Sequence, residues 1–191
     1  MSIVRVLSVA LAGFLLLADE GKGGGSSPAL AEFNTNVQQY LKIRKEATKA
    51  VPDLKKKATP KVVIAHEQAL AAAIRKARLA ARRGDIITPA AQKHFRSLTM
   101  GEVRSPGGAP VKDTIKQGNP PAEKEGADVK LQVNGDYPKA APKASMPASL
   151  LARFPELPEE LEYRFVGRTL ILLDTTANLI VDYAPQVGPS L

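Results

Sequence analysis

The chain contains no cysteine and no tryptophan, and only 5% of its 191 residues are aromatic. The absence of cysteine excludes disulfide bonds, thiolate metal sites and cysteine nucleophiles. The shortage of aromatic residues argues against a surface on which bases or sugars stack. Stability must therefore come from the packing of aliphatic residues and the few aromatics.

The longest apolar run, from Val6 to Ala18, is shorter than the about 20 residues that a membrane-spanning helix needs. It follows Arg5 and is typical of the apolar core of a secretory signal. Ala31 ends a small-x-small cleavage site, cleavage after Ala18 is the alternative, and an uncleaved membrane anchor is a third possibility. We therefore expect a periplasmic or secreted protein, with residues 1–31 as signal peptide and Gly/Ser spacer.

The positive charge is concentrated in one part of the sequence. The net charge is +8, yet residues 37–96 hold 15 Lys and Arg against 4 Asp and Glu. Such a region can bind anionic lipid headgroups, cell-wall polymers or nucleic acid by charge alone, or it can simply form a solvated outer face. Expected export and the lack of interleaved aromatics argue against nucleic acid. The candidate polyanion-binding residues are Lys42, Lys45, Lys49, Lys55, Lys56, Lys57, Arg75, Lys76, Arg78, Arg82 and Arg83.

Residues 32–104 form a basic helical region by their apolar spacing. Helix one is expected over about Asn34–Val51, helix two over Pro60–Arg83 and helix three over about Pro89–Glu102. Gly84 is a natural residue to end helix two, and the first two helices should form a hairpin. Arg44 falls inside an apolar stripe, so it is either a buried cation for an anionic ligand or, as we favour, an arginine whose head reaches water or an acidic neighbour.

Residues 105–127 are rich in Pro, Gly, Lys and Glu and are predicted to be a flexible linker. Residues 128–191 form the predicted β region. Val129–Val133 alternates as a short strand and is followed by a turn at Asn134-Gly135. This strand is expected to be a fourth member or edge of the C-terminal sheet.

Three further strands are predicted at Leu161–Val166, Thr169–Leu173 and Leu179–Tyr183. In the last strand, alternation places Val181 and Tyr183 with Leu179 on one face and places Ile180 and Asp182 on the other. The fold class is therefore α+β: a helical hairpin plus a third helix, a flexible linker, and a small three- to four-stranded antiparallel sheet.

No motif for catalysis or cofactor binding is present, since no P-loop, dinucleotide fingerprint or nucleophilic serine motif occurs. A two-histidine metal site from His66 and His94 is conceivable, but ordinary interfacial histidines are favoured because zinc sites use three or four protein ligands. Asp174 is better explained as a turn residue than as a catalytic acid. The glutamates Glu156, Glu159, Glu160 and Glu162 are interpreted as a solvated run. We predict no catalytic, cofactor or metal residues, and no enzyme activity.

The segments LEYRFVGRTLILLD and ANLIVDY resemble the closing hairpin of periplasmic nickel/cobalt-homeostasis proteins and related uncharacterised exported proteins. The matching positions are Tyr163, Val166, Asp174, Ile180 and Val181, within about the last 30 residues. Asn178 stands where that family usually has glycine. The resemblance implies a periplasmic or extracellular setting, and metal-handling residues are not evident.

The sequence thus favours an exported, non-enzymatic binding or structural protein of the bacterial envelope. Its sheet edge or an apolar helical face can dock another envelope protein. The alternatives are electrostatic binding to an anionic membrane surface, cell-wall polymer or nucleic acid through the basic helices, and periplasmic buffering of nickel or cobalt. No cofactor and no small-molecule substrate is indicated.

Overall fold

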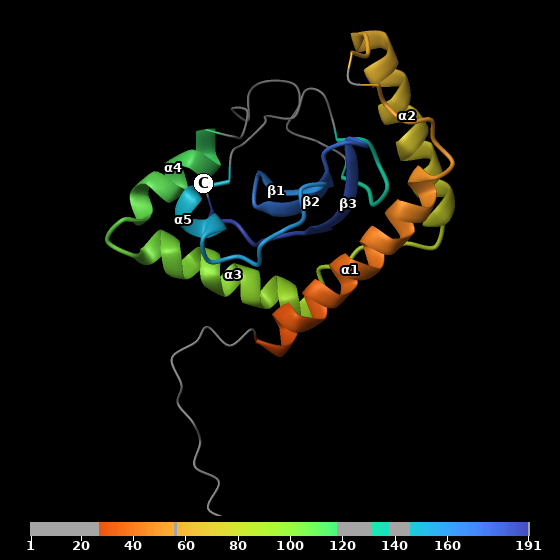
Figure 1. Ribbon diagram of the computed structural model, residues 1–191. Coiled ribbons are helices and arrows are strands. Elements are labelled where there is room, and N and C mark those ends of the chain that lie inside the picture. Colours follow the sequence, from red (N-terminus) through yellow and green to blue (C-terminus); the bar gives the residue numbers. More distant parts are fainter. Residues whose placement is uncertain (1–26, 56, 118–130, 138–145, 191) are drawn as a thin grey trace, which may run out of the picture.

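The computed structural model describes residues 27–55, 57–117, 131–137 and 146–190. Helices come first along the chain and a small sheet comes last, and Figure 1 shows the helices arranged around that sheet. The predicted α+β fold is confirmed. The elements are α1 (Pro28–Thr48), α2 (Pro60–Ala77), α3 (Pro89–Arg104), α4 (Gly108–Gln117), α5 (Ala148–Leu151), β1 (Leu161–Val166), β2 (Thr169–Asp174) and β3 (Leu179–Ala184).

The sheet is an antiparallel meander of order β1-β2-β3. Its strands begin where the sequence predicts them and end within one residue of the prediction. Gly167 in the first turn has φ 59° and Asn178 in the second has φ 47°, so both turns need the left-handed backbone that glycine and asparagine tolerate best. The strands were predictable because the alternation of apolar and polar residues and the position of the turn residues indicate the same strand boundaries.

A β-bulge in β3 makes one part of the prediction wrong. Leu172 pairs with Asp182 and Leu173 pairs with Ile180, so Val181 is an extra residue between the two pairs. One extra residue reverses the faces of everything after it. Asp182 therefore lies on the same side of the sheet as Leu172, and Tyr183 lies with Ile180 on the opposite side.

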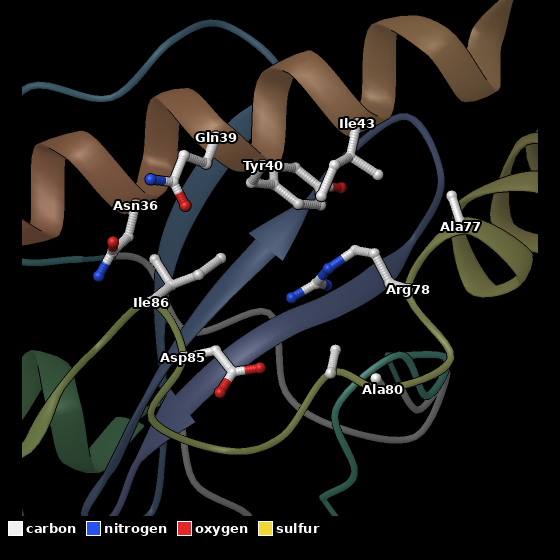
Figure 2. Close-up of a pocket in the computed structure, with 10 residues that line it drawn as sticks. Asn36, Gln39, Tyr40, Ile43, Ala77, Arg78, Ala80, Asp85 and Ile86 are labelled. Atoms are coloured by element: carbon white, nitrogen blue, oxygen red, sulfur yellow. The ribbon is translucent and has the colours of Figure 1, made fainter.

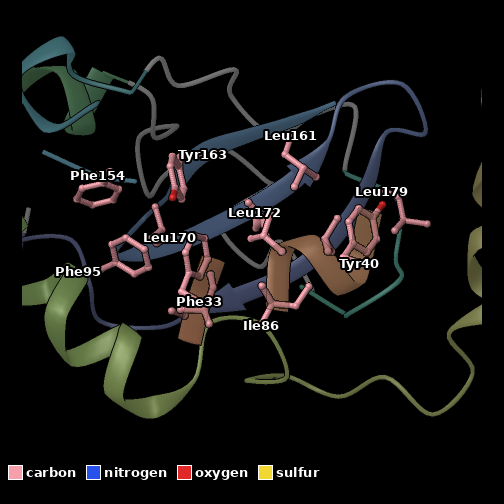
Figure 3. Packing of buried hydrophobic residues seen from close by; sticks show 14 of the residues in the cluster. Phe33, Tyr40, Ile86, Phe95, Phe154, Leu161, Tyr163, Leu170, Leu172 and Leu179 are labelled. Carbon is pink, nitrogen blue, oxygen red and sulfur yellow. The ribbon is translucent and has the colours of Figure 1, made fainter. Parts of the chain in front are cut away.

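The main core lies between the helices and one face of the sheet (Figure 3). Its centre is aromatic: the ring of Phe95 lies 5.2 Å from that of Phe33, 4.7 Å from that of Phe154 and 5.8 Å from that of Tyr163. Edge-on and tilted contacts of this kind stabilise a core beyond the area that they bury. Four of the few aromatic residues in the chain are thus used to join α1, α3 and the segment after α5 to β1.

The opposite face of the sheet has a smaller apolar cluster of Ile171, Leu173, Ile180 and Tyr137. Tyr137 reaches it from a segment, residues 131–137, that runs along the outer edge of β3. The predicted turn at Asn134-Gly135 is confirmed, with Asn134 at φ 61°.

The fourth strand is only partly as predicted. Residues 131–133 form no strand, and residues 129 and 130 lie outside the described residues. Contact with the sheet comes later, from the Asp136–Leu179 bridge and the backbone bonds of Asn134, Gly135 and Tyr137. Because the turn itself pairs with β3, the edge is a short contact and not a ladder.

Two helix boundaries also differ from the prediction. α1 begins at Pro28, six residues earlier than expected, because Ser27 caps it and Leu30 packs on the core. α2 ends at Ala77 and not at Arg83, since Arg78 leaves the helix to enter the interior. The two helices pack on each other, so the helical hairpin is confirmed (Figure 1).

Part of the predicted flexible linker is a helix. Residues 108–117 form α4, which packs on α3 through the buried side chains of Val111 and Ile115. The two apolar residues are four apart and share one face of a helix, which gives this short segment something to bury. Residues 118–127 lie outside the described residues. Within the described part of the chain, no helix has the length and apolar character needed to cross a bilayer.

Candidate functional site

The predicted basic residues divide into an exposed set and an interior set. Arg75 is half-buried and Arg78 is buried, while Lys56 lies outside the described residues. Lys49 pairs with Glu46 on the same helix. The remaining exposed cations are Lys42, Lys45, Lys55, Lys57, Lys76, Arg82 and Arg83.

Arg78 is a structural residue and its predicted place on an outer helical face is wrong. Its guanidinium donates to the carbonyl oxygen of Val181 at 3.2 Å and to Oδ1 of Asn134 at 2.8 Å, and it stacks 5.0 Å from the ring of Tyr40. Val181 is the bulged residue of β3, so the bulge exposes a carbonyl that the arginine can reach. Burial lowers the pKa of Arg78, an effect that nearby Tyr40 and Asp182 oppose.

Arg75 and Asn134 complete this junction between the end of α2 and the edge of the sheet. Arg75 Nε donates to the Asn134 carbonyl oxygen at 2.8 Å, and its Nη2 forms an ion pair with Asp136. The amide of Asn134 in turn donates to the Arg78 carbonyl oxygen at 2.8 Å. These two arginines therefore hold the segment 131–137 in place.

Asp182 is fully buried and organises the loop after α2. Its carboxylate accepts backbone N–H bonds from Gly84, Ile86 and Ile87, at 2.8 to 3.2 Å, and one from Tyr183 at 2.8 Å. Burial raises the pKa of Asp182, and the four N–H donors limit that rise. The carboxylate is occupied by these bonds, which makes it a support for the loop.

Asp174 is also fully buried, and its predicted role as a turn residue is confirmed. Its Oδ1 accepts N–H bonds from Thr176 and Ala177 within the turn. Its Oδ2 accepts from the Tyr40 hydroxyl at 2.7 Å and from Arg44 Nε at 2.6 Å. Burial, and then the Asp174 charge, raises the pKa of Tyr40 above its ordinary value.

The contacts of Arg44 decide between the two interpretations of its place in an apolar stripe. It pairs with buried Asp174 and, at 3.7 Å, with Glu160. The favoured alternative, an acidic neighbour, is confirmed, and the guanidinium is not left for an external anion.

A pocket of about 430 Å³ lies between α1 and the loop that Asp182 supports. Figure 2 shows the guanidinium of Arg78, the ring of Tyr40 and the carboxylate of Asp85 around it, with Ile43 and Ile86 among its apolar walls. Because Arg78 is already bonded to protein oxygens and Asp85 adds a negative charge to the rim, the pocket has no single charge preference.

The two histidines do not form a joint site. His66 Nδ1 lies 3.0 Å from the Pro52 carbonyl oxygen, and His94 Nδ1 lies 3.3 Å from Ser27 Oγ. Pro52 and Ser27 flank opposite ends of α1, a helix of 21 residues that spans about 31 Å at 1.5 Å per residue. One ion cannot contact both rings, and the described residues hold no group of three or more metal-ligating side chains.

A group of exposed aliphatic residues lies at the start of α2. Figure 1 shows the first turns of α2 extending past the end of α1 and away from the sheet. Val62, Val63 and Ile64 are 49%, 41% and 51% exposed, and Leu54 in the preceding connection is 42% exposed. Lys55, Lys57 and Lys61 are also exposed and are close to them in the sequence. We call these seven residues the α2 tip.

Sequence reasoning missed the α2 tip and the interior roles of Arg78 and Asp182. The tip had a signal, since three apolar residues in a row cannot all lie on one helical stripe. Arg78 and Asp182 had none, because both roles depend on the bulge in β3.

Comparison with family models, with curated proteins and with solved structures found no match to this chain. The resemblance of the last strands to nickel/cobalt-homeostasis proteins therefore stays a prediction.

Proposed function

We propose that the chain is an exported, non-enzymatic binding protein of the bacterial envelope, attached to an anionic surface by its basic helical region. The observation that carries this proposal is a set of exposed cations without ion-pair partners among the described residues. They lie on the outer side of α1, in the α1–α2 connection and at the end of α2: Lys42, Lys45, Lys55, Lys57 and Lys76.

These exposed cations are distinct from the charged residues that hold the fold together. Arg44, Arg75 and Arg78, which are also basic, are used within the fold. Asp174 and Asp182 are likewise used in internal bonds, so neither is a free acid or base. An unneutralised positive surface attracts polyanions over a Debye length of about 8–10 Å at physiological salt.

The test is a salt titration of binding to a soluble polyanion, polyphosphate, and to vesicles containing an anionic phospholipid. We expect the logarithm of the affinity to fall linearly with the logarithm of salt concentration. Replacing Lys42, Lys45, Lys55 and Lys57 with Gln should weaken polyphosphate binding about tenfold or more, because each lost contact removes one released counterion.

The matched control removes the same charge from elsewhere on the surface. Arg104, Lys112, Lys116 and Arg168 are exposed and lie outside residues 37–96, which carry the excess positive charge. Replacing these four with Gln should leave binding within about twofold of the original chain if the basic region is the contact. Equal losses in the two variants would show that only net charge matters, and absence of binding at low salt would refute the proposal.

A second candidate function is docking of another envelope protein at the sheet edge. β1 is an outer strand of the sheet, and a pocket of about 710 Å³ with Leu151, Leu157 and Tyr163 in its walls lies beside it. An extended partner segment can pair with an edge strand and place an apolar side chain in such a pocket. Pull-down from periplasm with the original chain and with Leu157→Asp tests it, and a partner retained equally by both would contradict docking at this pocket.

A further inference from the structure

We propose that the anionic surface is a lipid bilayer and that the α2 tip is the part that enters its headgroup region. This inference rests on the proposed attachment to an anionic surface and names the partner. The tip joins two features that one class of partner explains together: exposed aliphatic side chains and flanking lysines.

The aliphatic side chains of the tip do not form a single packing stripe. Val62, Val63 and Ile64 follow one another at 100° intervals around the helix, so they cover more than half of its circumference. Helices that pack on a protein surface carry a single apolar stripe. α2 has such a stripe further along, where Leu70 and Ile74 are buried against α1 and the core. Its first turns have apolar side chains on several sides, and these are 41% to 51% exposed.

The lysines of the tip lie next to the aliphatic residues in the sequence. Lys55 and Lys57 precede the helix, and Lys61 lies in its first turn. A membrane surface with anionic lipids attracts such cations, and an apolar helical segment can enter the headgroup and acyl boundary by about 5–10 Å. The long lysine stems let the ammonium groups stay at the phosphates while the valines and isoleucine go deeper.

Other partners explain only one of the two features. Polyphosphate, a cell-wall polymer or nucleic acid would engage the lysines but offers no apolar medium for four exposed aliphatic residues. A second copy docked tip to tip would cover the aliphatic residues but would bring two sets of lysines together, which like-charge repulsion opposes. A bilayer with anionic headgroups satisfies both.

The helix terminus is compatible with this location. Pro60 begins α2 and has no N–H, and Val63 N–H is bonded to the Thr59 carbonyl oxygen at 3.0 Å. The headgroup region supplies phosphate oxygens and water for the other N–H groups of the first turn. No backbone group of the tip must therefore enter hydrocarbon unsatisfied.

The first test uses the absence of cysteine from the sequence, which lets a single introduced thiol be labelled. Val63→Cys in the full chain is labelled with an environment-sensitive dye, and Ser149→Cys on α5 is the matched control at another exposed position. On vesicles of mixed anionic and zwitterionic phospholipid, we expect a blue shift and quenching by nitroxide lipids for the dye at position 63 only. No change at position 63, or equal changes at both positions, would overturn the inference.

The second test changes polarity while keeping the branching at Cβ. The variant V62T/V63T/I64T keeps branched side chains in the helix and should lower partitioning onto the same vesicles about tenfold or more. The control L79T alters an aliphatic residue outside the tip that is 85% exposed, and should leave partitioning within about twofold. Equal partitioning of the tip variant and the original chain would overturn the inference.

Polyphosphate binding separates failure of this inference from failure of the proposed function. The tip variant V62T/V63T/I64T should bind polyphosphate as the original chain does, since its charges are unchanged. A chain that binds polyphosphate but shows no tip contact with vesicles retains the proposed function and loses the lipid assignment. A chain that binds neither loses both. Light scattering that shows self-association abolished by V62T/V63T/I64T would assign the tip to a second copy instead.

Discussion

Asp182 shows how a single buried carboxylate can shape a loop that contains no regular structure. Three of its four N–H donors, Gly84, Ile86 and Ile87, come from the connection between α2 and α3. We expect Asp182→Asn to lower the free energy of unfolding by about 2–4 kcal/mol, because the amide turns an –NH₂ group toward buried donors. Urea denaturation measures the change.

The control for this prediction is Asp53→Asn, which makes the same chemical change at an exposed position. Its effect should stay within about 0.5 kcal/mol. If the two variants lose similar stability, the N–H bonds of Asp182 do not contribute as the geometry implies.

Tyr40 gives the fold a specific dependence on alkaline pH. Its hydroxyl donates to buried Asp174, and Tyr40→Phe should cost about 1–2 kcal/mol near pH 8. Above about pH 10 the unfolded chain ionises at this residue, whereas burial and Asp174 keep the folded residue protonated by raising its pKa. The folded state then binds more protons than the unfolded state, so the original chain loses stability as pH rises.

Tyr40→Phe lacks this ionisation, so its deficit relative to the original chain should shrink between about pH 8 and about pH 11. Urea midpoints measured at both values give the difference directly. Burial also raises the pKa of Tyr163. This residue is present in both chains, so its contribution to the pH dependence cancels in the difference. A deficit that grows with pH would contradict the assigned direction.

At the scale of elements, the strands were predictable and the helix ends were not. Strand positions follow from local alternation and from turns at Gly167 and Asn178, which act within a few residues. The end of α2 depends on Arg78 reaching Val181, which is 103 residues away in the sequence. The sequence pattern of the helix alone cannot predict a contact with such a distant residue.

The bulge in β3 is a second feature that the local sequence pattern does not predict. Simple alternation would place Asp182 on the face opposite Leu172, whereas the register places the two together. The bulge is stabilised by groups from elsewhere, namely the Arg78 guanidinium and the N–H groups of Gly84 and Ile86. The candidate site was predictable as a set of lysines, but its aliphatic part and its interior arginines were not.

α4 is held in place by the burial of one of its isoleucines. Ile115 is fully buried against α3 and the main core. Ile115→Ala should lower the free energy of unfolding by about 2–4 kcal/mol through lost burial and the cavity left behind. Lys112→Ala, on the exposed side of the same helix, should change it by less than about 0.5 kcal/mol. If both variants have similar, small effects in urea denaturation, residues 108–117 do not pack on the core and belong to the flexible linker that the sequence predicts.

At the scale of the whole molecule, the start of α1 bears on where the predicted signal peptide would be cleaved. Ser27 accepts the Leu30 N–H, its hydroxyl lies 3.3 Å from His94, and Leu30 packs on the main core. Cleavage after Ala31 would remove all of these contacts, whereas cleavage after Ala18 would keep them. The fold therefore favours the second of the two predicted cleavage points.

We expect a chain starting at Glu32 to be less stable than a chain starting at Asp19 by about 2–3 kcal/mol, from loss of the cap and of the Leu30 packing. Urea denaturation of the two chains tests the energetic part, and N-terminal sequencing of the protein from the periplasmic fraction tests the processing. Equal stability would show that residues 19–31 add nothing to the fold. A mature chain starting at Glu32 would contradict the preferred cleavage point, and a chain found only in the cytoplasm would contradict export itself.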